Sequence, residues 1–370
     1  MKKENTPAYT IINTVCKLKK SEKIIIVANP ETADMAQDLY AASLECGAEP
    51  TLLFQPAKKA MDAAEPAVIN ALKSEPDVFL SISFMKLGKD PEAAANPYTT
   101  DDGQKFDHIF DYLLNGKKTM RAVWTPGLTQ NMFDRTVNID YALLAERCNQ
   151  LGKKFENAVS ATVTSPAGTN LTVPLENRKA LFDNGDFSKP GSGGNIPAGE
   201  VFISPVVGNP LQDGTGCNGT IVYDGSMTFG DGDSIISTPI NVTVKNGFVT
   251  SVKGKQEAKR LLNTIQEAEN KAVKMEKEGK LPKGQGEIYK RNARNIGELG
   301  IGLNPSAIIS GNMLEDEKAF KTCHFAIGQN YDGDAPSLIH LDGVVKNPTI
   351  VIHYKDGSSF TALENGELKI

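Results

Sequence analysis

The chain has 370 residues, of which 40% are hydrophobic, and these values are typical of a globular protein of about two domains. Its 40 basic and 45 acidic residues give a formal net charge of −5, which argues against a nucleic-acid-binding surface. No segment approaches the roughly 18 consecutive apolar residues of a membrane helix, so we expect no membrane partner.

The N-terminal residues 1–20 and the cysteines indicate a cellular compartment. Lysines occur near the N-terminus, but no apolar stretch follows them as it does in a secretory signal. The five cysteines are scattered without any C-x-x-C spacing, which favours free thiols in a reducing environment. We therefore expect a cytoplasmic protein.

Short apolar runs alternate with segments of helical pattern over the first part of the chain. We predict strands at 23–29, 51–56, 77–83 and 119–127, and helices at 31–47, 65–75 and 105–116. This alternation is typical of crossover units that build a mostly parallel sheet. No G-x-G-x-x-G follows the first strand, so nothing indicates a nucleotide phosphate site. We predict an α/β domain over residues 1–155.

A different pattern follows a predicted helix at residues 139–153. Alternating β-branched runs, broken by Gly, Asn and Asp, occur at 159–175, 220–227, 240–254 and 348–370. A long amphipathic helix is predicted over 255–279, with its apolar face at Leu261, Leu262, Ile265 and Ala268. We predict a mainly antiparallel β (α+β) domain over residues 156–370, and it contains most of the residues suited to metal chemistry.

Two histidines and an aspartate near the C-terminus form a candidate metal-binding set. His340 and Asp342 lie two positions apart in the otherwise apolar run SLIHLDGVV. Residues i and i+2 of a strand point to the same face, so both side chains would leave it together. His324 lies in a second apolar run, CHFAIG. Two imidazoles and a carboxylate suit Zn, Mn, Co or Fe.

Two glutamates in apolar runs enlarge this set. Glu200 follows a Gly/Pro loop and opens a strand in NIPAGEVFISP, and Glu298 lies between glycines in GELGIGLNP. A carboxylate inside an apolar run needs a compensating charge. Metal ions would supply it, and an ion pair of Glu298 with Arg291 or Arg294 is the structural alternative.

These motifs carry a resemblance. NIPAGEVFISP, GELGIGLNP, CHFAIG with Tyr331 seven residues after His324, and HLDG occur in this order over the second half. Together they resemble the motif series of the aminopeptidase T/aminopeptidase S metallopeptidases, the M29 family.

The resemblance implies a metallo-aminopeptidase, a hydrolase that removes the N-terminal residue of a peptide, and members are typically homodimers. It implies two divalent ions, Zn, Co, Mn or Mg, held by Glu200, Glu298, His324, Tyr331, His340 and Asp342. Two ions roughly 3.5–4 Å apart acidify a bridging water and polarise the scissile carbonyl. The expected catalytic residues are Glu200 and Glu298, either of which suits the bridging role, and Tyr331, as a ligand or oxyanion donor.

One position departs from the family pattern. Members carry a glutamate about five residues before the first histidine, where this chain has Ala319. Glu317 takes that role only if the loop is two residues longer. Without it, the second metal would be held weakly.

Two alternatives stay open. His324, His340 and Asp342 are also the makings of a mononuclear Fe(II) site in a ring-cleaving dioxygenase related to the 2,5-dihydroxypyridine dioxygenases, which resemble the same peptidase fold. A non-catalytic relative that only binds metal is the other. The presence of both Glu200 and Glu298 favours the peptidase, acting on a peptide or another small molecule.

Overall fold

The computed structural model describes residues 6–59 and 62–370. The chain divides into two compact units. The parallel-sheet unit comprises Met1–Ala145 and Asp183–Ala198, and the antiparallel-sheet unit comprises Glu146–Phe182 and Gly199–Ile370. Helix α7 (Tyr141–Phe155) crosses from one to the other. Over the described residues, no helix has the length and apolarity needed to span a bilayer.

The parallel-sheet unit is built on a five-stranded sheet, which confirms the predicted parallel sheet. In spatial order its strands are β10 (Gly193–Asn195), β6 (Arg121–Trp124), β3 (Val78–Ile82), β1 (Lys23–Ala28) and β2 (Glu49–Phe54), with parallel pairing throughout. Strand β3 is wholly buried, and β1 is buried apart from its first residue. Such continuous apolar strands are expected where both faces of a sheet are covered.

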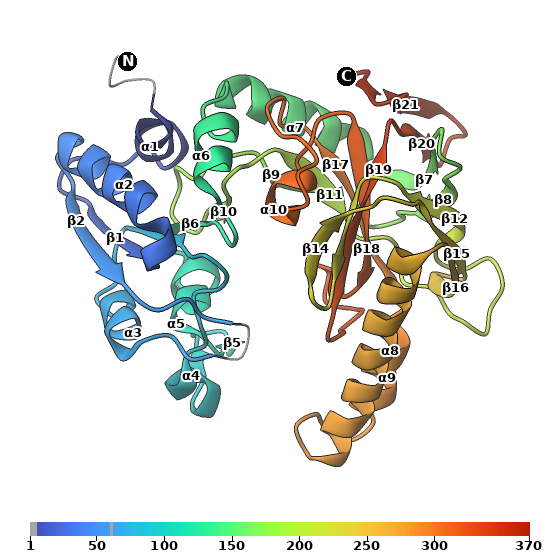
Figure 1. Ribbon diagram of the computed structural model, residues 1–370, viewed down its shortest axis with the longest axis horizontal. Helices are drawn as coiled ribbons and strands as arrows, with labels where there is room; N and C mark the ends of the chain where they lie inside the picture. Colours follow the sequence, from blue (N-terminus) through green and yellow to red (C-terminus); the bar gives the residue numbers. More distant parts are fainter. Residues whose placement is uncertain (1–5, 60–61) are drawn as a thin grey trace. The chain divides into compact units, whose positions relative to one another are not determined.

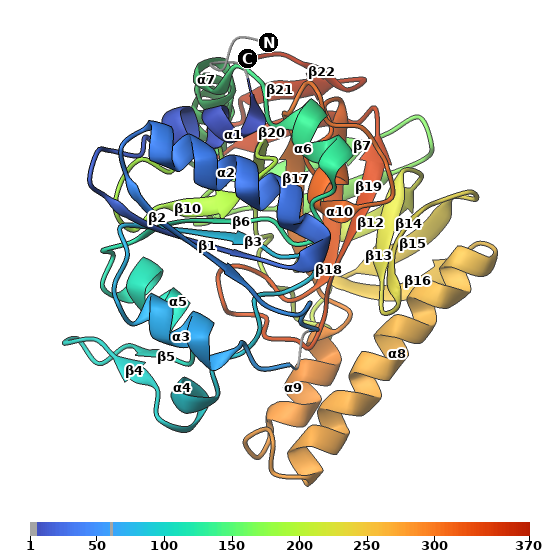
Figure 2. The same ribbon diagram turned by 60° about the vertical axis from the view of Figure 1, so that its left-hand side comes forward.

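Helices cover both faces of this sheet. Figure 2 shows α2 (Ala33–Glu45) on one face, with α3 (Pro66–Leu72) and α5 (Ile109–Asp111) on the other. The other described elements of this unit are α1 (Pro7–Tyr9), η2 (Thr10–Val15), η3 (Pro30–Thr32), α4 (Pro91–Ala95), β4 (Tyr98–Thr99), β5 (Lys105–Phe106), η4 (Tyr112–Gly116) and α6 (Gln130–Thr136). The helix predicted over 105–116 therefore begins only at Ile109, because its first residues pair as strand β5 with β4.

The antiparallel-sheet unit contains two larger sheets, whose presence confirms the predicted antiparallel β structure (Figure 1). The seven-stranded sheet has the order β14 (Gly232–Ile235), β13 (Ser226–Phe229), β19 (His340–Lys346), β18 (Thr322–Gly328), β17 (Ile296–Gly302), β11 (Glu200–Ile203) and β9 (Leu181–Asp183). The eight-stranded sheet has the order β16 (Phe248–Lys253), β15 (Ile240–Lys245), β12 (Asn218–Tyr223), β8 (Asn170–Pro174), β7 (Ala158–Thr164), β20 (Thr349–Tyr354), β21 (Ser359–Glu364) and β22 (Glu367–Leu368).

The core of this unit contains a contact between the two sheets. Tyr223 of β12 is fully buried, and its hydroxyl donates a hydrogen bond to the carbonyl of Phe325 in β18 at 3.3 Å. Its ring lies over Gly343 of β19, where a Cβ would approach the ring to 2.4 Å. One face of the β18–β19 pair therefore packs into the core, and the opposite face is left for other side chains.

Three helices complete the unit. Helix α8 (Gln256–Lys277) is the predicted amphipathic helix, and it buries Leu261, Ile265 and Ala268 as expected, whereas Leu262 is only partly buried. It packs beside α9 (Gln285–Asn292), and both lie together in Figure 1. The short helix α10 (Met313–Asp316) precedes β18 and carries the chain into the candidate site.

Candidate metal site

Five of the six residues predicted as metal ligands lie on four neighbouring strands, β19, β18, β17 and β11. They are Glu200 in β11, Glu298 in β17, His324 in β18, and His340 and Asp342 in β19. Residues paired directly across a sheet share a face, as do residues two apart along a strand. The register pairs Ala326 with both Glu298 and Asp342, and it pairs Glu200 with Gly302, four positions beyond Glu298. All five side chains therefore leave the same face. The structure therefore brings them together as predicted.

Small residues on this face leave room for the larger side chains. Gly300 is paired directly with His324, and a Cβ at position 300 would lie 2.0 Å from the His324 Nε2 atom. Ala326, between Glu298 and Asp342, carries only a methyl group. In the GELGIG segment of β17, every second position beyond Glu298 is a glycine, so this face of the strand leaves space for the side chains of the cluster.

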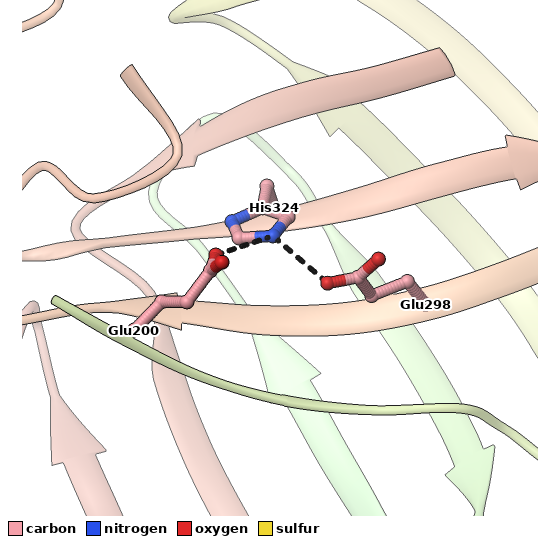
Figure 3. Close-up of side chains that lie close together, drawn as sticks. All are labelled: Glu200, Glu298 and His324. Atoms are coloured by element: carbon pink, nitrogen blue, oxygen red, sulfur yellow. Dashed lines mark hydrogen bonds and ion pairs between the residues drawn. The ribbon is translucent and has the colours of Figure 1, made fainter. Parts of the chain in front are cut away.

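Glu298 is the centre of the cluster. Its Oε1 accepts a hydrogen bond from His324 Nε2 at 3.3 Å, and its Oε2 lies 3.2 Å from His340 Nε2. His340 Nε2 is also 3.3 Å from Asp342 Oδ1. On the other side, His324 Nε2 is 3.5 Å from Glu200 Oε2 (Figure 3). The alternative ion pair of Glu298 with Arg291 or Arg294 is absent from the ion pairs of the described residues, and Arg294 pairs with Glu269 instead.

The backbone fixes the orientation of the His340 ring. Its Nδ1 lies 2.8 Å from the carbonyl oxygen of Gln329, which only accepts hydrogen bonds, so Nδ1 carries a proton. In the neutral ring, Nε2 is then the lone-pair nitrogen, and it points at Glu298 and Asp342. A ligating histidine held in this way by its second nitrogen is typical of metal sites.

Glu317 and Lys318 join the cluster from the segment after α10. The Lys318 side chain is fully buried, and its Nζ forms ion pairs with Glu200 Oε1 at 2.7 Å and with Glu317. Burial raises the pKa of Glu317 to about 8, opposed by the ammonium of Lys318 and aided by Glu200. Glu317 is thus the acid of this segment that reaches the cluster, whereas Ala319 contributes no donor group. That Glu317 takes the role of the family glutamate stays a prediction.

Lys318 was not among the predicted site residues, although its sequence context contains a signal. Its segment, LEDEKAF, has four charges among apolar residues, and such charges are buried only with partners. Two of these acids hold the preceding loop, because Glu315 accepts from the Ile308 amide and Asp316 from the Ser310 amide. The remaining two charges, Glu317 and Lys318, point to the site.

Opposite charges govern the protonation of the cluster. Burial raises the pKa of Glu298, but hydrogen bonds from His324 and His340 outweigh this effect and hold the pKa below its ordinary value. Burial likewise raises the pKa of Asp342, and His340 outweighs it and holds the pKa at about 2. Burial lowers the pKa of His324, yet its carboxylate neighbours raise it to about 9. Without a metal ion, protonated imidazoles therefore balance the carboxylates.

The donor atoms fit a divalent metal ion. Over residues 6–59 and 62–370, three groups bring their donor atoms within 4.8 Å of one another: Glu200–Glu298–His324, Glu298–His340–Asp342 and Glu317–His324–Asp342. Three buried atoms, Glu200 Oε2, His324 Nδ1 and Asp342 Oδ1, make no hydrogen bond with any described residue. Buried polar atoms are normally satisfied, and a cation would satisfy the two oxygens. Carboxylate oxygens and imidazole nitrogens suit Fe(II), Mn(II), Co(II) or Zn(II).

Tyr331, the sixth predicted ligand, lies at the rim. Tyr331 is 58% exposed, and its ring packs against the His340 ring with the two centroids 5.3 Å apart. The same ring also contacts Phe202 at a centroid distance of 5.0 Å. Metal ligation by Tyr331 stays a prediction.

Three comparisons relate the chain to known proteins. The sequence profile of the family described as NicX, 2,5-dihydroxypyridine 5,6-dioxygenase, matches residues 132–353. The solved structures of 2,5-dihydroxypyridine dioxygenase from Pseudomonas putida KT2440 and of wild-type AmpT from Thermus thermophilus each share the fold with a TM-score of 0.66 at 16% identity. The superpositions cover 98% of this chain and 96% and 98% of those chains. No curated protein matches the sequence.

Proposed function

The chain belongs to the 2,5-dihydroxypyridine 5,6-dioxygenase family, and from this premise we propose that it is a metal-dependent dioxygenase that opens a hydroxylated aromatic ring. The match to this family spans residues 132–353, and this range contains β11, β17, β18 and β19, the strands that carry the cluster. This coincidence of family match and donor cluster carries the proposal. The sequence motifs favoured a peptidase, and the family match favours the dioxygenase alternative instead.

Glu298, His340 and Asp342 are the proposed ligands of an Fe(II) ion. Their donor atoms form one of the three groups, and His340 directs Nε2, which becomes its lone-pair nitrogen on loss of a proton, toward both carboxylates. Iron(II), when bound, supplies the electrons that make dioxygen reactive toward an aromatic ring. The mononuclear triad expected from the sequence was His324, His340 and Asp342, but Glu298 lies between the two imidazoles. We therefore place Glu298, rather than His324, in the triad.

The remaining residues of the cluster hold a proton and limit access of water. His324 keeps a proton at Nε2, between Glu298 and Glu200, and so orients the Glu298 carboxylate. Glu298 and His324 are almost completely buried, which excludes bulk water from this end of the site. His324 is also a group able to donate its proton to a deprotonated oxygen of the substrate or product during the reaction.

An aromatic surface next to the cluster suits a planar substrate. The exposed ring of Tyr331 contacts both Phe202 and His340 and offers a stacking partner beside the proposed ligands. We propose a dihydroxylated aromatic or pyridine ring as the substrate class. A cytoplasmic location and a homodimer stay predictions.

An aminopeptidase is the second candidate, because the three overlapping donor groups offer more than one position for a metal and AmpT shares the fold. In that reaction, Glu200 would serve together with Glu298, as the resemblance to the M29 family implies. The two candidates differ in whether oxygen is consumed.

The test is a paired assay on one preparation. Protein loaded anaerobically with Fe(II) is mixed with 2,5-dihydroxypyridine and related dihydroxylated rings in an oxygen electrode, while the ring absorbance is followed. Zn(II)-, Co(II)- and Mn(II)-loaded samples are assayed with aminoacyl p-nitroanilides. We expect the Fe(II)-loaded sample to consume oxygen and the aromatic substrate in equal molar amounts, and we expect no peptidase activity in the other samples. Peptidase turnover without oxygen uptake would overturn the proposal.

A further inference from the structure

The cluster contains one fully buried lysine, Lys318, which pairs with two of its carboxylates. Lys318 follows α10, and its side chain has no exposed surface. Its Nζ lies 2.7 Å from Glu200 Oε1 and also pairs with Glu317. An ammonium group is rarely buried so completely, and it needs nearby carboxylates when it is.

The carboxylates that Lys318 contacts belong to two of the three donor groups. Glu200 is part of Glu200–Glu298–His324, and Glu317 is part of Glu317–His324–Asp342. A divalent ion in either of these groups would share a carboxylate with the ammonium and lie close to its positive charge. Like charges at such distances repel strongly in a buried site.

The third donor group is different. Among the ion pairs of the described residues, those of Lys318 are with Glu200 and Glu317, so its charge reaches this third group only through space, where it helps to lower the pKa of Asp342 after burial and His340. A cation in this group uses oxygens that the lysine leaves available. The cluster thus offers one position for a metal ion and fills the neighbouring position with its own side chain.

We propose that Lys318 acts as a fixed monovalent cation in place of a second metal ion and so limits the cluster to one divalent ion. This inference rests on the proposed metal binding by the cluster, but not on the identity of the substrate. Lys318 is a positioning residue in this role, because it acts through Glu200 and Glu317. Its removal should leave a second group of donors without a cation.

The test counts Mn(II) ions per chain by equilibrium dialysis and electron paramagnetic resonance. We expect one Mn(II) in the unchanged protein and two in Lys318→Met, with the spectrum of an exchange-coupled pair in the variant. Lys321→Met is the matched control, because Lys321 lies three residues further on, is half exposed and pairs with Glu367 away from the cluster. It should bind one ion.

Each outcome decides the proposal. Two ions in the unchanged protein, or one ion in a folded Lys318→Met, would overturn it. Lys318→Gln, which keeps a hydrogen-bond donor, replaces Lys318→Met if that variant does not fold, and the count for the unchanged protein decides if neither folds. One ion without oxygen uptake would refute the dioxygenase while the inference on Lys318 stands. Binding of no ion would refute both.

Discussion

Gly300→Ala tests whether the site depends on the empty space above β17. A Cβ at this position would lie 2.0 Å from His324 Nε2, about 1.4 Å inside the 3.4 Å at which ordinary contacts begin. The Gly300 backbone does not adopt a positive φ, so the strain would come from the clash with the ring. Overpacking of this kind costs typically about 1–3 kcal/mol. We expect a loss of about 2 kcal/mol in the free energy of unfolding of the metal-free protein.

The matched control removes the ring instead of the space. In a His324→Ala background the three atoms nearest to the added methyl group are gone, so Gly300→Ala should change the free energy of unfolding by less than about 0.5 kcal/mol. Urea unfolding followed by circular dichroism gives all four values of this double-mutant cycle. An equal loss in both backgrounds would refute the argument, because the cost would then not arise from the contact between positions 300 and 324.

Three further predictions concern the proposed ligands. His340→Ala should abolish tight Mn(II) binding while the circular dichroism spectrum stays unchanged. His353→Ala is the control and should bind Mn(II) normally, because the His353 ring contacts Thr162 in the eight-stranded sheet, away from the cluster. Equal binding by both variants would exclude His340 as a ligand. Glu298→Gln should weaken Mn(II) binding on the order of tenfold or more, because it removes the charge that both imidazoles contact, and unchanged affinity in calorimetry would assign it a purely structural role. Burial lowers the pKa of His340, but Asp342 and Glu298 outweigh it and hold the pKa well above its ordinary value, so the Nε2 proton must leave when metal binds. The affinity for Mn(II) should therefore rise with pH from about 6.5 upward. An affinity that does not depend on pH would contradict this.

Local periodicity explains why much of the site was predictable. His340 and Asp342 share a face because strand residues alternate, and the apolar context of Glu298 indicated its burial correctly. The strand register is different, because it depends on pairing between distant segments. The alignment of Gly300 with His324, and the approach of Glu317 to the cluster, follow from that pairing and from the course of the loop after α10.

The role of Lys318 was hidden for a related reason. In the sequence it is one charge within an acidic run, and an acidic run is most often solvated. Only the three-dimensional structure shows that Glu315 and Asp316 are used by backbone amides of their own loop. The lysine is therefore left to balance acids that are contributed by other parts of the chain, above all Glu200, which lies 118 positions earlier.

The fold does not choose between oxygenation and hydrolysis, because a dioxygenase and AmpT superpose on this chain equally well. What differs between the two chemistries is the number of metal ions that they require. Hydrolysis by a pair of ions needs both positions of the cluster open to divalent cations, whereas a mononuclear iron site needs one. On our proposal, a buried ammonium closes the position bordered by Glu200 and Glu317. Glu200, which favoured a peptidase in the sequence, then holds the lysine together with Glu317, and the cluster keeps one position for a metal ion, as the proposed dioxygenase requires.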